Sequence, residues 1–182
     1  RDCQTAKFRI LKRAARMKQR LLAIIVGASA LLLGACQGYD FKVNDKVVYS
    51  PAPLFTQFQT PDTALRTCLE QAIIDASITS AEQLTTLNCS HAGIESLEGL
   101  AVFTGIKALR LSSNQIRNLV EIGQLAALEE LYLEDNRVID PVPLYRLPAL
   151  RTVDLSDNSD LQCPRRGGLK QVQQLLLPGH CQ

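Results

Sequence analysis

Apolar residues recur along the middle of the chain at a fixed interval of 22 positions. The same interval places an asparagine at Asn114, Asn136 and Asn158, with Ala92 one interval earlier. Eight columns align in this way over more than three units, which is typical of a repeat protein. The leading columns are Leu84/Ile106/Leu128/Leu150, Leu87/Leu109/Leu131/Val153 and Cys89/Leu111/Leu133/Leu155.

Each unit is predicted to contain a short strand, a turn and an irregular return. The alternation Leu109-Arg110-Leu111 indicates a strand with one buried face. The asparagine ends that strand, because a buried turn needs a side chain that both donates to and accepts from backbone groups of adjacent coils. Apolar residues three apart follow and favour 3₁₀ or extended segments, with which the helix-breaking Pro141 and Pro143 agree.

The pattern LxxLxLxxNxI resembles the leucine-rich-repeat family, in the 22-residue variety found in internalins. The resemblance implies an α/β fold: a short right-handed solenoid with a parallel sheet on its concave face, a helical N-terminal cap and a disulfide-closed C-terminal cap. It covers residues 60–182, with the N-terminal cap over 60–83, the repeats over 84–158 and the C-terminal cap over 159–182. Both caps are needed, because no single coil buries its apolar face alone.

The N-terminal cap is predicted to begin at Thr60-Pro61-Asp62, with the proline at a permitted early helical position. Ser80-Ala81-Glu82-Gln83 fits a capping box for a further helical turn before the first coil. At the other end, an amphipathic stretch over residues 169–177 leads to Cys181. The apolar stripe of the first helix comprises Leu65, Cys68, Leu69, Ala72 and Ile73.

The first 35 residues have the organisation of an export signal. Residues 1–16 precede Met17, the expected start, and residues 17–35 combine a basic beginning with a short apolar run. The run ends in Leu33-Gly34-Ala35-Cys36, which resembles a bacterial lipobox and implies that the thiol of Cys36 is acylated. Gln37 after it implies sorting to the outer membrane, facing either the periplasm or the cell surface. The alternative is an ordinary secretory signal, with Cys36 in a disulfide.

Residues 36–59 are expected to carry the lipid and to link it to the body. Either this segment is an extended tether, or residues 39–49 form a hairpin around a turn at Asn44-Asp45. Ser50-Pro51-Ala52-Pro53 ends any strand there.

Four cysteines remain for the body of the protein: Cys68, Cys89, Cys163 and Cys181. An exported protein meets an oxidising compartment, so two disulfides are expected, with three possible connectivities. Sequence position favours Cys68–Cys89 and Cys163–Cys181. Cys89 occupies a core leucine position of the first coil and faces the cap, which supports its pairing with Cys68.

Charge excludes one class of partner. The net charge of +2 hides a basic leader, with eight Lys/Arg and one acid in residues 1–35. Subtraction leaves 20 − 8 = 12 bases and 18 − 1 = 17 acids, a net charge of −5, for residues 36–182. A mildly acidic body argues against binding to nucleic acid.

The strand residues that point away from the core form the candidate binding surface. The central column pairs Arg110 with Tyr132, two residue types common at interaction hot spots, and carboxylates make the later half acidic. A basic segment of another protein is the complementary ligand; the alternative is a solvated face that only keeps the protein soluble. The candidate partner-binding residues are Asn88, Arg110, Tyr132, Asp154, Glu130, Glu134, Asp135 and Asp157.

No catalytic site, cofactor or metal site is expected. His91 lies near Cys89, but that cysteine is at a core position, and Asp154 is three strands away, too far to orient the imidazole. The acidic residues form no calcium-binding loop, no CxxC pair occurs, and the two histidines, at 91 and 180, are far apart in the sequence. The sequence therefore predicts a monomeric protein-binding lipoprotein. The alternatives are a regulator or inhibitor of an envelope or secreted hydrolase and, more remotely, an enzyme.

Overall fold

A computed structural model describes residues 41–43, 46–49 and 52–182. The chain divides into two units, one ending at Pro51 and the other running from Ala52 to Gln182. The leader over 1–35 and the predicted lipidation site Cys36 lie outside the described residues, as does the predicted turn at Asn44-Asp45.

The first unit contains a β-hairpin. Strand β1 (Phe41–Val43) pairs antiparallel with strand β2 (Lys46–Tyr49), and the register shifts between Phe41 and Lys42. Of the two alternatives, the described residues 41–43 and 46–49 therefore show hairpin pairing rather than a wholly extended tether.

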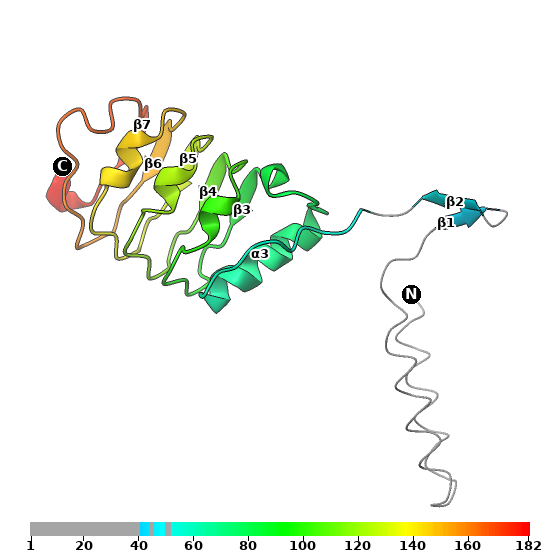
Figure 1. The fold of residues 1–182 in the computed structure, drawn as a ribbon. Coiled ribbons are helices and arrows are strands. Elements are labelled where there is room, and N and C mark those ends of the chain that lie inside the picture. The colour runs from blue at the N-terminus through cyan, green and yellow to red at the C-terminus, as the bar shows by residue number, and fades with distance from the viewer. Residues whose placement is uncertain (1–40, 44–45, 50–51) are drawn as a thin grey trace, which may run out of the picture. The chain divides into compact units, whose positions relative to one another are not determined.

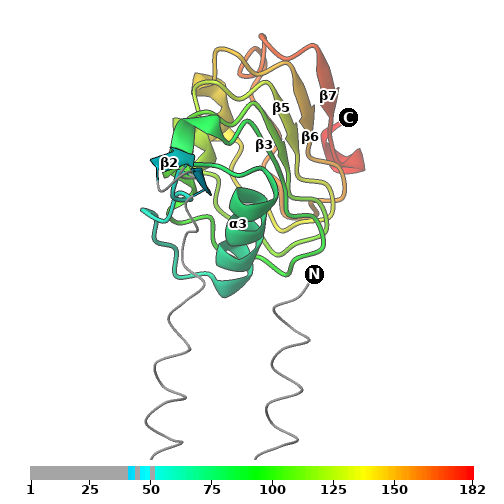
Figure 2. The ribbon, with the colours of Figure 1, turned by 90° about the vertical axis from the view of Figure 1, so that its right-hand side faces the viewer.

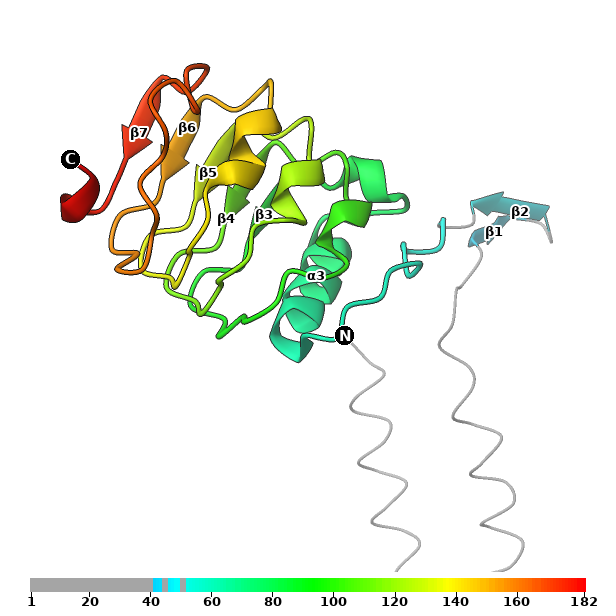
Figure 3. The ribbon, with the colours of Figure 1, turned by 60° about the vertical axis from the view of Figure 1, so that its left-hand side comes forward.

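The second unit is a solenoid whose strands stack into one parallel sheet. The strands are β3 (Thr86–Asn88), β4 (Ala108–Arg110), β5 (Glu130–Tyr132), β6 (Thr152–Asp154) and β7 (Gln174–Leu176), in that order across the sheet. Leu87 pairs with Leu109, Leu109 with Leu131, and Leu131 with Val153, so the sheet register equals the 22-residue interval of the sequence. Figure 3 shows the strands side by side in chain order.

The return segments lie on the opposite side of each coil from the sheet (Figure 2). They contain 3₁₀ helices at Leu100–Val102, Ile122–Gln124 and Val142–Arg146, the last with Pro141 as its N-cap. The leucines and isoleucines of the repeat columns fill the space between the two sides, and most are less than 4% exposed. The predicted strand, turn and 3₁₀ return are therefore confirmed.

The asparagine column ties each coil to the one before it. Asn136 Oδ1 accepts from the backbone N–H of Ile116 at 3.0 Å, and its Nδ2 donates to the carbonyl oxygens of Leu111 at 2.9 Å and Leu133 at 3.1 Å. Asn114 and Asn158 make the same set of bonds one repeat away on either side. All three side chains are buried, and each satisfies backbone groups that water cannot reach.

Helix α3 (Thr63–Asp75) forms the N-terminal cap beside β3 (Figures 1 and 2). It buries Leu65, Leu69 and Ile73 against the first coil. Its N-cap is Asp62, whose Oδ1 accepts from the N–H of Leu65 at 2.9 Å. Pro61 thus precedes the helix instead of occupying its first turn, which corrects the predicted start by two residues.

Asp62 also joins the cap to the first coil. Its Oδ2 accepts from the N–H groups of Glu95 and Ser96, both at 2.9 Å. Burial by itself raises the pKa of this carboxyl, but the backbone N–H donors outweigh burial, and the net pKa of Asp62 is lowered. The carboxylate is therefore stabilised in its charged form at the junction of cap and repeats.

The predicted capping box at Ser80 is wrong in detail. Ala81–Gln83 forms a 3₁₀ helix, but the Ser80 side chain makes no capping hydrogen bond. Gln83 Oε1 instead accepts from the N–H and the hydroxyl of Thr79, at 2.8 and 3.1 Å. Gln83 thus reaches back from the third position of the turn, but to Thr79 and not to the N-cap residue Ser80.

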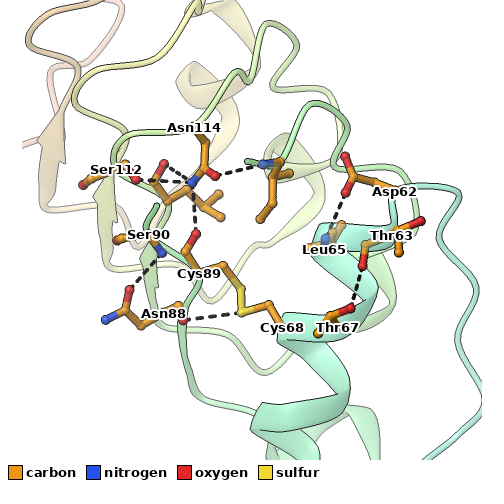
Figure 4. Close-up of a disulfide and its surroundings, with 12 residues drawn as sticks. Asp62, Thr63, Leu65, Thr67, Cys68, Asn88, Cys89, Ser90, Ser112 and Asn114 are labelled. Atoms are coloured by element: carbon orange, nitrogen blue, oxygen red, sulfur yellow. Dashed lines mark hydrogen bonds between the residues drawn. A yellow bond between two sulfur atoms is a disulfide. The ribbon is translucent and has the colours of Figure 1, made fainter. Parts of the chain in front are cut away.

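Both disulfides of the body have the connectivity that sequence position favoured. Cys68 of α3 is bonded to Cys89, which follows β3 (Figure 4). Cys163 is bonded to Cys181 near the C-terminal end of the described chain. One bond therefore closes each end of the repeat ladder.

The C-terminal segment does more than cap the ladder, because it adds the fifth strand, β7, to the sheet. Val153 of β6 pairs with Leu175, and Leu155 donates its N–H to the carbonyl of Leu176 at 2.9 Å. The 22-residue columns do continue this far, through Val172, Leu175 and Leu177. The expectation of an amphipathic cap alone after Asn158 is corrected in this respect.

Within the described parts of the chain, no helix is long and apolar enough to cross a membrane.

Candidate binding face of the sheet

The side chains of the strands alternate between the core and the outer face, and the outer face carries the residues singled out from the sequence. In β4 and β5 the leucine points inward, while Arg110 and Tyr132 lie in register on the outside. Adjacent parallel strands are about 4.8 Å apart, so outward residues in register are neighbours. We call this surface the concave face: it comprises the outward residues of β3–β7 and of the turns that follow β3–β6.

Arg110 and Tyr132 form the centre of the concave face. The guanidinium carbon of Arg110 lies 4.6 Å from the centre of the Tyr132 ring, which is a cation–π contact. Arg110 is exposed, Tyr132 is half-buried, and the Tyr132 hydroxyl lies 3.4 Å from Glu130 Oε2. The pair is therefore held in place before any partner arrives, which lowers the entropic cost of using it in binding.

The residues at the two ends of the central column, Asn88 and Asp154, make hydrogen bonds within their own turns. Asn88 Oδ1 accepts from the N–H of Ser90 at 3.2 Å. Asp154 Oδ1 accepts from the N–H of Ser156 at 2.9 Å and from its hydroxyl at 2.6 Å. Asp154 is only 7% exposed, so the expectation that it is exposed on this face is corrected: it orders the turn after β6, and its part in partner binding stays a prediction.

Asp135 and Asp157, which lie in the turns after β5 and β6, also have a structural role. Together with His91 and Ser113 they occupy one position in successive repeats, and all four have φ between 53° and 58°. This left-handed conformation tolerates Asp better than most non-glycine residues. Both carboxylates nevertheless remain exposed and free to meet a partner.

Negative charge collects beside the Arg110–Tyr132 pair. Burial raises the pKa of Glu134, and the neighbouring carboxylates of Asp154, Asp157 and Asp135 raise it further. The salt bridge found within the described residues joins Lys107 to Glu129 at 3.3 Å and involves none of these acids. The acidic edge of the concave face (Glu134, Asp135, Asp154 and Asp157) is thus not neutralised by an ion pair from the described chain.

Sequence reasoning missed two features of this face. Leu176 extends the central column, in register with Asp154, and is 58% exposed. A hollow of about 780 Å³ lies at the other end, lined by α3, Asn88 and Ala92. Adding 22 to Asp154 would have located Leu176, whereas the hollow depends on how α3 packs and has no signal in the sequence.

The arrangement contains no nucleophile–base pair at His91. Cys89 is 2% exposed and is bonded to Cys68, so it offers no thiol. The group of three metal-ligand side chains identified among the described residues lies in the C-terminal cap and not on this face. The concave face is suited to contact a partner surface, through an aromatic–cation centre with an acidic and an apolar flank.

A five-stranded parallel ladder with an asparagine column and an exposed sheet face defines a leucine-rich-repeat solenoid, and such solenoids bind partners through their extended sheet surface. Among solved structures, the chain is similar to an internalin (inlF) from Listeria monocytogenes, with 24% identity over 66% of this chain and a TM-score of 0.56. It is also similar to internalin inlC2 of the same organism, with 28% identity over 46% of this chain and a TM-score of 0.43.

The first likeness shows that the fold is an internalin-like solenoid. The chain spans 37% of the length of each of these two internalins. No protein-family model and no curated protein matches the chain.

Proposed function

We propose that this chain is a non-enzymatic module that binds another protein through the concave face. The observation that carries the proposal is the Arg110–Tyr132 contact at 4.6 Å, held at the centre of an exposed sheet surface. Arginine and tyrosine are enriched among the residues that contribute most to binding at interfaces, above all when packed near the centre. The internalin-like fold supports the same kind of function.

The partner segment we propose is basic. The acidic edge is not ion-paired by the described chain, and repulsion from the neighbouring carboxylates adds to burial in raising the pKa of Glu134. A lysine- or arginine-rich segment placed there relieves that repulsion and accelerates encounter. Raising the salt concentration from 50 to 500 mM should therefore weaken binding, because exposed charges are screened.

A pull-down from envelope extracts tests this proposal. The bait variant Arg110→Ala/Tyr132→Ala should recover at least about tenfold less partner than the unaltered chain, since loss of a hot spot costs about 2 kcal/mol or more. Arg117→Ala/Val120→Ala is the matched control, because it also removes one arginine and one apolar residue from exposed positions, outside the concave face. Equal recovery with both double variants contradicts the assignment of the binding face.

The same pull-down distinguishes a simple binding module from a regulator. If the captured partner is an envelope or secreted hydrolase, its activity is measured free and bound to the chain. Loss or gain of activity that disappears with Arg110→Ala/Tyr132→Ala supports regulation. Unchanged activity supports attachment or scaffolding.

We further propose that the module is monomeric and anchored to the bacterial outer membrane through a lipid on Cys36. The lipobox-like Leu33-Gly34-Ala35-Cys36 and the following Gln37 support this proposal. Palmitate labelling that disappears in Cys36→Ser, together with processing blocked by globomycin, is the expected result. Mature protein that is unacylated and released into the medium contradicts it.

A further inference from the structure

Three metal-ligand side chains meet in the C-terminal cap, outside the concave face. Cys163, His180 and Cys181 each offer one ligand atom, and these atoms lie within 4.8 Å of one another. Cys163 and His180 are exposed, and Cys181 is half-buried. An ion in solution therefore has direct access to the group.

A backbone carbonyl orients the imidazole of His180. Its Nε2 lies 2.9 Å from the carbonyl oxygen of Leu161. Because a carbonyl oxygen only accepts, Nε2 carries the proton and the lone pair of the neutral ring is on Nδ1. A ring nitrogen that donates to a backbone carbonyl, while the other is free to ligate, is the usual arrangement of metal-binding histidines.

The two sulfurs are withheld from a cation while they are bonded to each other. Thiolates, and not disulfide sulfurs, are the metal ligands that cysteine provides. The two bonds differ in solvent access: Cys163 is exposed and Cys181 half-buried, whereas Cys68 is half-buried and Cys89 is 2% exposed. A mild reductant thus reaches Cys163–Cys181 before Cys68–Cys89.

We propose that reduction converts the C-terminal cap into a two-cysteine, one-histidine site for Zn²⁺ or a similarly thiophilic cation. A dithiol reduces the bond to two thiols and itself becomes a disulfide; a phosphine does so with one water molecule, which supplies both protons and leaves its oxygen on the phosphine oxide. The cation then displaces both thiol protons and binds the two thiolates and His180, without changing its own oxidation state. Solvent fills the fourth position.

The dimensions suit such a site. Tetrahedral zinc has Zn–S distances of about 2.3 Å and Zn–N distances of about 2.1 Å, which place its ligand atoms roughly 3.5–3.8 Å apart. The ligand atoms of Cys163, His180 and Cys181 already lie within 4.8 Å of one another, so small side-chain movements bring them to these separations. The cation then closes the same 163–181 loop that carries β7, so the cap stays shut in reducing conditions as well.

Anaerobic titration of the full chain with Co²⁺ and then Zn²⁺ tests the proposal. After treatment with a phosphine reductant, the chain should show thiolate-to-cobalt charge transfer and tetrahedral cobalt bands, which Zn²⁺ abolishes. The oxidised chain should show neither. The double variant Cys163→Ser/Cys181→Ser keeps the other four cysteines and should lose one equivalent of binding relative to the unaltered chain.

Two further variants identify the ligands. His180→Ala should weaken binding at least about tenfold, on the scale typical for disturbing a metal site, while His91→Ala, its matched control, should not. Cys68→Ser/Cys89→Ser should retain full binding, because these two cysteines belong to no group of metal-ligand atoms identified among the described residues.

Zinc should also raise the melting temperature of the reduced chain, and not that of reduced Cys163→Ser/Cys181→Ser. This measurement stays informative if the double-serine variant folds poorly, because His180→Ala can form both disulfides while it folds and is reduced only afterwards, so it serves as the second comparison. Binding by the oxidised chain equal to that of the reduced chain overturns the proposal. So does equal binding by His180→Ala and the unaltered reduced chain.

Discussion

Helix α3 covers the first strand of the sheet, whereas the last strand, β7, leaves Leu175 37% and Leu176 58% exposed. At the β3 end, three fully or nearly buried apolar residues of α3 and the Asp62 carboxylate join the cap to the first repeat, and the disulfide includes the buried Cys89. At the β7 end, the disulfide includes an exposed Cys163.

The difference shows two ways of ending a repeat ladder. A helix that buries apolar surface stabilises the first coil through packing, and its disulfide adds to a contact that already exists. The C-terminal segment buries Leu161 and Leu169, but the leucines of β7 itself are exposed, so we expect covalent closure to contribute more to holding β7 on the sheet. We therefore expect β7 to open more readily than β3–β5.

The largest expected effect on the free energy of unfolding comes from a substitution at the packed N-terminal end. Leu69→Ala removes a side chain that is 0% exposed in α3 and should lower the free energy of unfolding by about 4 kcal/mol, through lost burial and the cavity left behind. Leu175→Ala, the same change at the other end, should cost about 1 kcal/mol because its side chain is already partly in water. Denaturant unfolding of both variants measures the contrast. Equal losses would show that the two ends are held alike.

Removing either disulfide should lower the free energy of unfolding by a similar amount, but the two losses should destabilise different parts of the chain. They close sequence separations of 21 and 18 residues, so each is expected to contribute about 3 kcal/mol through chain entropy. In Cys163→Ser/Cys181→Ser, hydrogen exchange should accelerate in β7 and leave β3–β5 protected. In Cys68→Ser/Cys89→Ser, α3 should remain on the first coil.

Exchange that accelerates uniformly across the sheet in Cys163→Ser/Cys181→Ser would contradict a locally weak C-terminal end. Mass spectrometry during mild reduction adds an independent check, since free thiols should appear at Cys163 and Cys181 before Cys68 and Cys89.

A smaller effect is expected from removing the Asp62 carboxylate, which accepts backbone hydrogen bonds at the N-terminal cap. Asp62→Ala should cost about 1 kcal/mol at neutral pH, the usual contribution of an N-cap. Because the pKa of Asp62 is lowered in the folded chain, its stabilisation is fully present above the ordinary value of 3.8 and is lost as the pH falls through the folded pKa. The variant should thus be less stable than the unaltered chain at pH 7 and should approach it near pH 2.

Asp62→Asn serves as the control for Asp62→Ala, because it keeps a capping oxygen and removes the titration. A loss in Asp62→Ala that is the same at pH 7 and pH 2 would show that the charge of Asp62 is not involved.

The smallest expected effect concerns the acidic edge. The folded pKa of Glu134 is raised, so the deprotonated form is disfavoured on folding, and stability from this group is present at low pH and lost as the pH rises through the folded pKa. Glu134→Gln should therefore raise the melting temperature slightly at pH 7, with the difference shrinking towards pH 4. A lower melting temperature at pH 7 would mean that the carboxylate has a favourable partner.

The repeat fold was readable from the sequence because its determinants are local and periodic. The core columns and the asparagines recur at one interval, and the position of Cys89 in a leucine column indicated its pairing with Cys68. Strand β7 was missed because His180 stands where the earlier repeats have a buried asparagine, and because its leucines are partly exposed.

The candidate site was predictable in position but not in the state of each side chain. Alternation along the strands placed Arg110 and Tyr132 together on the outer face. The burial of Asp154 could not be predicted from the sequence, since it depends on the hydrogen bonds from Ser156 and on the neighbouring strand β7. The meeting of His180 with two cysteines was hidden too, because it arises from chain reversal within the cap.

The central claim is that the partner lies on the concave face, and site-specific photo-crosslinking in cells tests it most directly. A photoreactive residue at position 112, which keeps both Arg110 and Tyr132, should give one partner-dependent crosslinked band, and the same residue at position 120, outside that face, should give none. Crosslinks from position 120 alone would contradict the account and place the binding surface elsewhere on the solenoid.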